Sequence, residues 1–355
     1  GAEPGLANVD LRGSLLSRGQ AEVTPSIIYA SGTIALVDGI EELRLDGLEV
    51  GFQPLYLAAL RDLAPDQAER LRGTLQGSIQ LSGTLSDIRL ADGLLAYEVG
   101  DAPTTRFAGV TGRIVRRPEP AYTISAVAQP LALASLTELF PGLPFRAATV
   151  SGPLDLSGNT ERIDLTADLE GTAGGVAFTA SMTFGEPAAF EVEGDLTAFA
   201  AGMILRPELP IEGPLSGTFA LAGTTESFDF DVDLTQQGGR FDLAGTVSLL
   251  TEYPLFEVAG NVENFRIGAL LGDPSVFPDP MTGAVALTGG GEGPYRFDVD
   301  LTGATGRLDL AGFYLPNDVP TYEATGYVAG LDLSRLPLRP RLPASALTGS
   351  VEISG

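Results

Sequence analysis

Acidic residues at alternate positions are the side chains of this sequence with the clearest potential for chemistry. Asp231 and Asp233 lie in the segment FDFDVDLT, and Asp298 and Asp300 lie in YRFDVDLT. Glycoside hydrolases place two carboxylates across one bond, and calcium binds clustered carboxylate oxygens. The same pairs recur from one segment to the next, however, whereas an active site is usually singular. We therefore interpret them as a solvated acidic surface and predict no enzymatic activity, no catalytic residue, no cofactor and no metal site.

The residue types that are missing argue against several further classes of protein. The sequence has no His and no Cys, and all 21 of its basic residues are Arg. Without a His base, a conventional Ser or Cys nucleophile is excluded, and without Cys there is neither a thiolate metal site nor a disulfide framework. The formal net charge of −25 opposes binding to nucleic acid phosphates and adhesion to anionic lipid headgroups. We therefore expect no nucleic-acid partner.

A pair of glycines six positions apart, enclosing five alternating residues, recurs along the whole chain. Successive pairs begin 64, 75, 65, 66 and 66 residues apart, and a period this steady is typical of a repeat architecture. The pairs are Gly13/Gly19, Gly77/Gly83, Gly152/Gly158, Gly217/Gly223, Gly283/Gly289 and Gly349/Gly355. The predicted boundaries are 1–70 for an imperfect first repeat, 71–146, 147–210, 211–280 and 281–345 for repeats two to five, and 346–355 for the start of a truncated sixth. We therefore expect the chain to be a segment of a longer protein.

Each repeat carries a pattern that predicts β-strands. In Phe228–Thr235, Phe, Val and Leu alternate with Asp and Thr, as the period of two in a strand requires. Similar segments joined by short turns predict about four antiparallel strands per repeat, with each bracket glycine beginning a strand. Short helices ended by prolines are expected near 133–140, 199–205 and 265–271, and Leu55–Leu63 in the first repeat also shows helical spacing.

One face of these strands is apolar, and the predicted helices are too short and too few to cover it. Leaving one Phe or Leu exposed costs roughly 1.5–3 kcal/mol relative to burial, so a bare, wet face is untenable. Three solutions stay open: a sheet folded against itself, a closed barrel or solenoid, and a groove filled by an apolar ligand. The residues predicted to line this face share strand parity; they are Phe219, Leu221, Phe230, Val232, Leu234, Phe241, Leu243, Phe256, Val258, Val285, Leu287, Phe297, Val299, Leu301, Leu308 and Leu310.

The order of these motifs resembles that of a known family. The LxGxLxLxG brackets, the FDVDLTxxxGRxDLAG hairpins and the junction Gly330–Gly355 are similar to the TamB and AsmA-like proteins of Gram-negative bacteria, over most of the chain from Leu71 onward. The resemblance implies an all-β fold, in which an elongated, repeat-built antiparallel sheet is curled into a U-shaped (β-taco) apolar groove with short helices between repeats.

The same resemblance implies a function and a location. The groove would conduct the acyl chains of phospholipids between the inner and outer membranes, as part of outer-membrane biogenesis. This chain would be a middle segment that lies in the periplasm, anchored in the inner membrane by a segment outside this sequence, and the longer protein would have an outer-membrane partner protein.

A protein of a different class would carry the same pattern. A structural or adhesive β-repeat or solenoid protein with a dry core also alternates apolar and polar residues. Solenoid coils have a shorter period of about 20 to 30 residues, so four-stranded repeats of this length favour the groove. The discriminating observation is whether the apolar side chains interdigitate or line an open channel.

Overall fold

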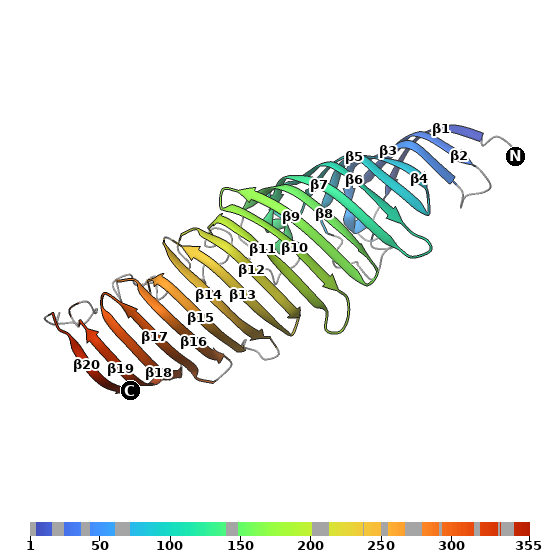
Figure 1. The fold of residues 1–355 in the computed structure, drawn as a ribbon. Helices are drawn as coiled ribbons and strands as arrows, with labels where there is room; N and C mark the ends of the chain where they lie inside the picture. The colour runs from blue at the N-terminus through green and yellow to red at the C-terminus, as the bar shows by residue number, and fades with distance from the viewer. Residues whose placement is uncertain are drawn as a thin grey trace. The chain divides into compact units, whose positions relative to one another are not determined.

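The computed structural model of the chain is all-β, as predicted. The described residues are 5–15, 25–36, 43–60, 72–139, 148–200, 213–236, 238–249, 255–266, 279–290, 293–315, 320–332, 334 and 344–355. Their 20 strands belong to one antiparallel sheet (Figure 1). The chain divides into two compact units. Within the described ranges, unit 1 ends at Thr179 and unit 2 begins at Ala180, so the division falls inside strand β10 (Gly174–Thr183).

Unit 1 is a succession of antiparallel hairpins in which each strand pairs with the next one along the chain. Three of the described strands lie within residues 1–70, and four lie within 71–146. The strands are β1 (Gly5–Leu15), β2 (Ser26–Leu36), β3 (Leu43–Tyr56), β4 (Thr74–Thr84), β5 (Asp87–Glu98), β6 (Thr105–Val115), β7 (Ala121–Ala132), β8 (Thr149–Asn159) and β9 (Arg162–Gly171).

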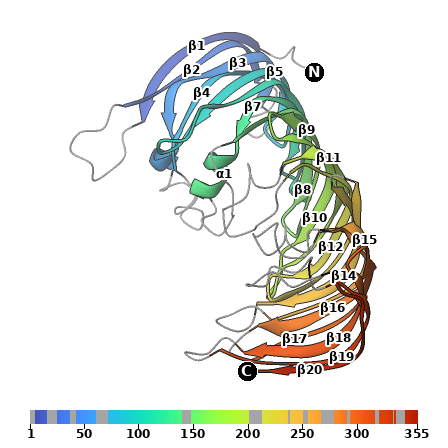
Figure 2. The same ribbon diagram turned by 90° about the vertical axis from the view of Figure 1, so that its left-hand side faces the viewer.

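The helical predictions have mixed outcomes. The helix expected near 133–140 is confirmed as α1 (Leu133–Leu139), which Figure 2 shows on the concave side of the strands of unit 1. The helical interpretation of Leu55–Leu63 is wrong at its start, because β3 continues to Tyr56. The 3-10 helix η2 (Leu57–Leu60) follows, and residues 61–63 lie outside the described residues. Phe199 and Phe265 end strands, and most of the helices expected at 199–205 and 265–271 lies outside the described residues.

Unit 2 repeats the same antiparallel meander, again with neighbouring strands paired in chain order. Each bracket strand is followed by three further described strands before the next bracket strand, so a repeat has four strands, as the sequence predicted. The strands are β11 (Ala189–Phe199), β12 (Leu215–Thr224), β13 (Ser227–Gln236), β14 (Gly239–Ser248), β15 (Leu255–Phe265), β16 (Met281–Gly290), β17 (Tyr295–Gly303), β18 (Gly306–Leu315), β19 (Thr321–Leu331) and β20 (Leu347–Ser354).

Short polar side chains close the tight turns locally. The hydroxyl of Thr224 accepts hydrogen bonds from the backbone N–H groups of Glu226 and Ser227, both at 3.2 Å, between β12 and β13. In unit 1, the side-chain oxygen of Asn159 accepts hydrogen bonds from the N–H groups of Glu161 and Arg162 at 2.7 and 2.8 Å. Such Asx and Ser/Thr turns supply backbone partners within the loop itself.

The first glycine of each bracket lies inside its strand and does not begin it, which corrects the prediction. Gly217, for example, is the third residue of β12 and Gly283 the third of β16. Gly217 has φ +136°, and a Cβ built there would overlap the carbonyl oxygen of Asp233 on the adjacent strand. Gly283 meets the carbonyl oxygen of Asp300 in the same way. The repeat spacing therefore marks a close backbone approach that only glycine permits.

A second recurring feature is a β-bulge at the point where one repeat meets the next. The strand before each bracket strand of unit 2 has an irregularity in its register, at Leu196/Phe199, Val262/Phe265 and Val328/Leu331. At each of these bulges, a backbone N–H donates to a hydroxyl that directly precedes the bracket glycine. The pairs are Ala198 to Ser216 at 2.9 Å, Asn264 to Thr282 at 3.0 Å and Gly330 to Thr348 at 3.0 Å. The side chain thus satisfies the N–H that the bulge withdraws from the ladder.

Candidate functional site

The strand register of unit 2 assembles the apolar side chains into rows that run across the sheet. Directly paired residues of an antiparallel sheet lie on the same face. The first row contains Leu234, Phe241, Val262, Leu301, Leu308 and Val328, with Gly217, Gly283 and Gly349 between them. The row lies at the ends of the strands, along the border of the sheet where the bracket strands begin. We call this border the first-row edge. We call the face to which the row belongs the apolar face.

Two further rows lie beside the first on the apolar face. The second row contains Phe219, Val232, Leu243, Val285, Val299, Leu310 and Val351, and the third contains Val192, Leu221, Phe230, Val258, Leu287, Phe297 and Ile353. Each row is interrupted only by small residues, such as Gly260 and Gly326 in the second row and Gly245 and Gly312 in the third. The apolar surface therefore extends over every described strand of unit 2.

The structure places all the residues predicted to line this face on it. Leu234, Phe241, Leu301 and Leu308 belong to the first row. Phe256 belongs to a fourth row, described below, and the remaining predicted residues belong to the second and third rows. The sequence pattern did not select Val262, Met281, Val328 and Leu331. The signal that was available is strand parity, because Val262 follows Phe256 and Val258 at even spacing.

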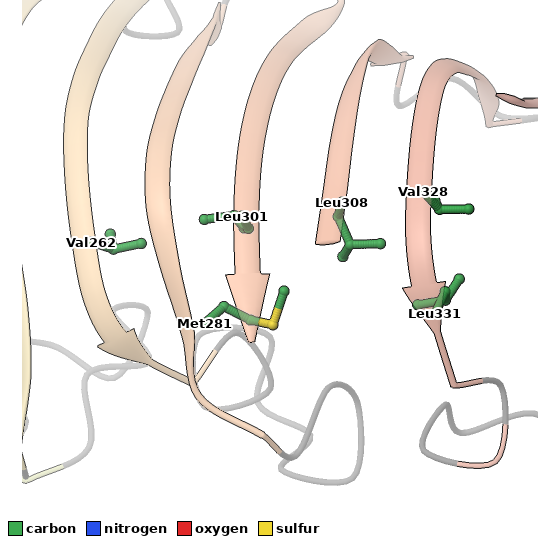
Figure 3. Close-up of a cluster of buried hydrophobic side chains, with 6 residues drawn as sticks. All are labelled: Val262, Met281, Leu301, Leu308, Val328 and Leu331. Atoms are coloured by element: carbon green, nitrogen blue, oxygen red, sulfur yellow. The ribbon is translucent and has the colours of Figure 1, made fainter. Parts of the chain in front are cut away.

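Burial decreases from the first row to the third. In the first row, the side chain of Leu301 is only 3% exposed, and it clusters with Val262, Met281, Leu308, Val328 and Leu331 from strands β15 to β19 (Figure 3). In the third row, Leu287 is 41% exposed and Ile353 is 48% exposed. The cluster at the first-row edge of the apolar face is therefore shielded from solvent, whereas the third row is accessible to it.

Aromatic rings cover the glycines of the third row. A Cβ on Gly245 would lie 2.9 Å from the ring of Phe230, and a Cβ on Gly312 would lie 2.8 Å from the ring of Phe297. In the first row, Phe241 makes an edge-to-face contact with Phe265, with ring centroids 5.2 Å apart. The rings lie over neighbouring backbone, so the hydrophobic surface is continuous where the sequence has no side chain.

The acidic pairs point away from this face, and ion pairs engage one member of each. Asp233 accepts two hydrogen bonds from Arg240, both at 2.7 Å, and Asp300 accepts two from Arg307, both at 2.9 Å. The hydrogen bonds from Arg240 lower the pKa of Asp233, with a further coulombic contribution from the same guanidinium. Asp242 lies directly opposite Asp233, so Arg240 also offsets repulsion between like charges across the strands.

The opposite face, which we call the polar face, contains two shallow depressions at equivalent positions of successive repeats. One is lined by Ala220, Ala244 and Ala259 together with acidic residues, and the other by Ala286 and Ala311 with Arg296, Phe313 and Glu323. Small side chains form the floor of both depressions. Both are open to solvent and lie on the face that carries the charges.

The described residues include neither a cluster that could hold a metal ion nor a helix that could span a membrane. No group of three or more Asp or Glu side chains there has an arrangement that would hold a metal ion. Within the same ranges, no helix has the length and hydrophobicity that a membrane span needs. The predicted absence of catalysis stays a prediction.

Comparisons with known proteins leave the chain without an assigned family. No family model, no curated protein and no solved structure matches it.

Proposed function

We propose that the apolar face of unit 2 is the wall of a groove that conducts phospholipid acyl chains. The observation that supports this most directly is the set of three apolar rows that cross the unit without a charged residue and remain accessible in the third row. In line with the resemblance to the TamB and AsmA-like family, we place the segment in the periplasm, in a longer protein that carries lipid between the inner and outer membranes.

The hydrophobic effect favours an occupant for this face. Each large apolar side chain left in water forgoes roughly 1.5–3 kcal/mol of burial free energy. In the third row, Leu287 and Ile353 are exposed, and the other large side chains of the second and third rows are only partly buried. An acyl chain is a suitable occupant because burial is non-directional and needs no polar contact. It can also follow a surface on which Phe, Val and Leu alternate with glycine.

The charge distribution agrees with this proposal. The carboxylates of the repeated strands lie on the polar face, so they keep the chain soluble without entering the apolar rows. A charge placed among these rows would be desolvated by bound acyl chains, at a cost of several kcal/mol. One such charge would interrupt a continuous apolar path.

Two matched variants on one strand test the proposal. Val258 and Ala259 are consecutive residues of β15 that point to the apolar and polar faces, respectively. We expect the wild-type chain and Ala259→Arg to retain co-purifying phospholipid, measured by native mass spectrometry after expression in a Gram-negative bacterium. We expect Val258→Arg to retain much less, although it adds the same side chain to the same strand.

The contrary outcomes are also defined. If the wild-type chain carries no lipid and its apolar side chains prove to be close-packed, the chain is a structural or adhesive β-repeat protein with a dry core. If both arginine variants keep the wild-type lipid content, lipid binds elsewhere and the apolar face is not the path.

A further inference from the structure

A fourth row of the apolar face lies at the edge opposite the first row, and it is predominantly aromatic. We call it the rim row. The register pairs Phe228 with Val247, Val247 with Phe256, Tyr295 with Tyr314, and Tyr314 with Tyr322. Phe190 extends the row on β11, where it pairs with Gly223. Of the rim-row residues, only Phe256 was among those predicted to line the apolar face.

In two successive repeats, two aromatic rings of the rim row lie close together at the second glycine of the bracket. Gly223 lies between Phe190 and Phe228, whose ring centroids are 5.9 Å apart. In the next repeat, a Cβ on Gly289 would lie 2.6 Å from the ring of Tyr295, and this ring is 6.0 Å from that of Phe256. Two successive repeats thus build the same aromatic pair over a glycine at the same edge.

The two edges of the apolar face differ in burial and in connections. Tyr314 is 41% exposed and Tyr322 is 43% exposed, whereas Val262, Leu301, Leu308 and Val328 of the first row are buried. Fifteen residues separate Phe199 from Leu215, Phe265 from Met281, and Leu331 from Leu347, and all three connections leave from the first-row edge. At the rim edge, the connections between the strand pairs β12/β13, β14/β15, β16/β17 and β18/β19 are at most six residues long.

Hydrogen-bond donors are also present in the rim row. Within the described part of the chain, the hydroxyls of Tyr295, Tyr314 and Tyr322 make no hydrogen bond. A tyrosine side chain combines an apolar ring with a polar tip, and it is enriched where hydrocarbon meets water. The ester and phosphate oxygens of a glycerophospholipid are acceptors that such hydroxyls can reach at a hydrocarbon boundary.

We infer that the rim row is the open edge of the groove and holds the glycerol-ester and phosphate region of a bound phospholipid, with the acyl chains directed toward the first row. This inference rests on the proposed function and adds an orientation to it. The buried first row excludes a polar headgroup from its own edge, because a polar group desolvated there would lack partners. The rim row supplies both an accessible edge and neutral donors, so phosphate recognition needs no cation there.

Photocrosslinking on the full chain tests this orientation. The probes are two phosphatidylcholines, one with a diazirine in the headgroup and the other with a diazirine at the end of one acyl chain. Strand β18 contains a residue from each edge, namely Leu308 in the first row and Tyr314 in the rim row. We expect the headgroup probe to label Tyr314 and its neighbour Tyr322, and the acyl probe to label the partly buried second-row residues Leu310 and Val299, which lie next to the buried Leu308 and Leu301, as read by fragmentation mass spectrometry.

Hydroxyl removal supplies a second readout. The double variant Tyr314→Phe, Tyr322→Phe keeps both rings, and we expect its lipid to dissociate faster by about fivefold per hydrogen bond lost. Tyr327→Phe is the matched control, since Tyr327 is 45% exposed but lies on the polar face, opposite Asp309. We expect this control to release lipid at the wild-type rate.

The outcomes separate this inference from the proposed function. If neither probe binds the wild-type chain, the proposed function fails. If lipid binds but the two probes label both edges of β18 equally, or in the reverse order, the proposed function stands and the orientation is wrong. Equal lipid release from the double variant and the control would likewise overturn the role of the rim hydroxyls.

Discussion

The ion pair of Asp233 and Arg240 shows how single residues keep the polar face compatible with its density of acids. Arg240 lowers the pKa of Asp233. The pair therefore contributes its full share to the stability of the folded chain above the ordinary aspartate pKa of about 4. This contribution to stability is lost as the pH falls through the lowered pKa of the folded state. We expect Arg240→Gln to raise the pKa of Asp233 toward its ordinary range. A pH titration of the side-chain carboxyl carbon by NMR measures this, and an unchanged pKa would contradict it.

Gly217 is the residue on which the close approach of β12 and β13 depends most directly. A methyl group there would overlap the carbonyl oxygen of Asp233, and φ +136° is itself unfavourable for alanine. We expect Gly217→Ala to lower the free energy of unfolding by about 1–3 kcal/mol, measured by urea unfolding followed by circular dichroism. Gly293 is the control, because its nearest atom is 3.6 Å away and its φ is ordinary; Gly293→Ala should change stability by less than about 0.5 kcal/mol. Equal losses in the two variants would rule out the backbone overlap as the cause.

At the scale of strands, the bulge before each bracket strand depends on one hydroxyl. Thr282 accepts a hydrogen bond from the N–H of Asn264 at 3.0 Å. We expect Thr282→Val to cost about 0.5–1.5 kcal/mol and to accelerate hydrogen exchange at the amide of Asn264. Thr302→Val is a fair comparison, since Thr302 pairs directly with Thr282 on the same face and its hydroxyl makes no hydrogen bond among the described residues. Unchanged exchange at Asn264 would mean that the hydroxyl does not hold the bulge.

The strands were predictable because their signal is local. Alternation of apolar and acidic residues within Phe228–Thr235 defines β13 without reference to any neighbour. The helical spacing of Leu55–Leu63 misled for the opposite reason. Leu55 pairs with Leu75 on β4, and the N–H of Tyr56 donates to the hydroxyl of Ser26 on β2, so contacts distant in sequence extended the strand against the local pattern.

The candidate site was predictable only in part, because its rows depend on register between strands. Parity assigned Phe219, Val232 and Leu243 to one face, but only the pairing places them in one row. The difference between the buried first row and the accessible rim row is likewise a property of the assembled sheet. The tyrosines of the rim row were passed over for this reason, since an exposed Tyr in an isolated strand carries no signal of its own.

Along the chain, residues that lie one repeat apart make equivalent contacts and are of similar types. Ser216, Thr282 and Thr348 lie 66 residues apart in turn and accept equivalent hydrogen bonds. Phe230 and Phe297 cover equivalent glycines. Because each described strand pairs with its neighbours along the chain, stability is approximately a sum over repeats. One repeat therefore acts as an exchangeable structural unit.

Deletion of residues 217–282 tests this conclusion directly. It joins Ser216 to Gly283, so the hydroxyl that binds the N–H of Ala198 is kept, and Val285 and Leu287 take the places of Phe219 and Leu221 opposite β11. We expect the shortened chain to keep its β-sheet circular dichroism and cooperative unfolding, and to carry less phospholipid per chain by native mass spectrometry.

Deletion of 218–282 is shorter by one residue, and a slip of one residue moves every side chain of a strand to the other face. Ala284 and Ala286 would then replace apolar-row residues while Val285 and Leu287 faced the acidic side, so this chain should lose lipid and cooperativity. If the two deletions behave alike, strand parity does not define the apolar face.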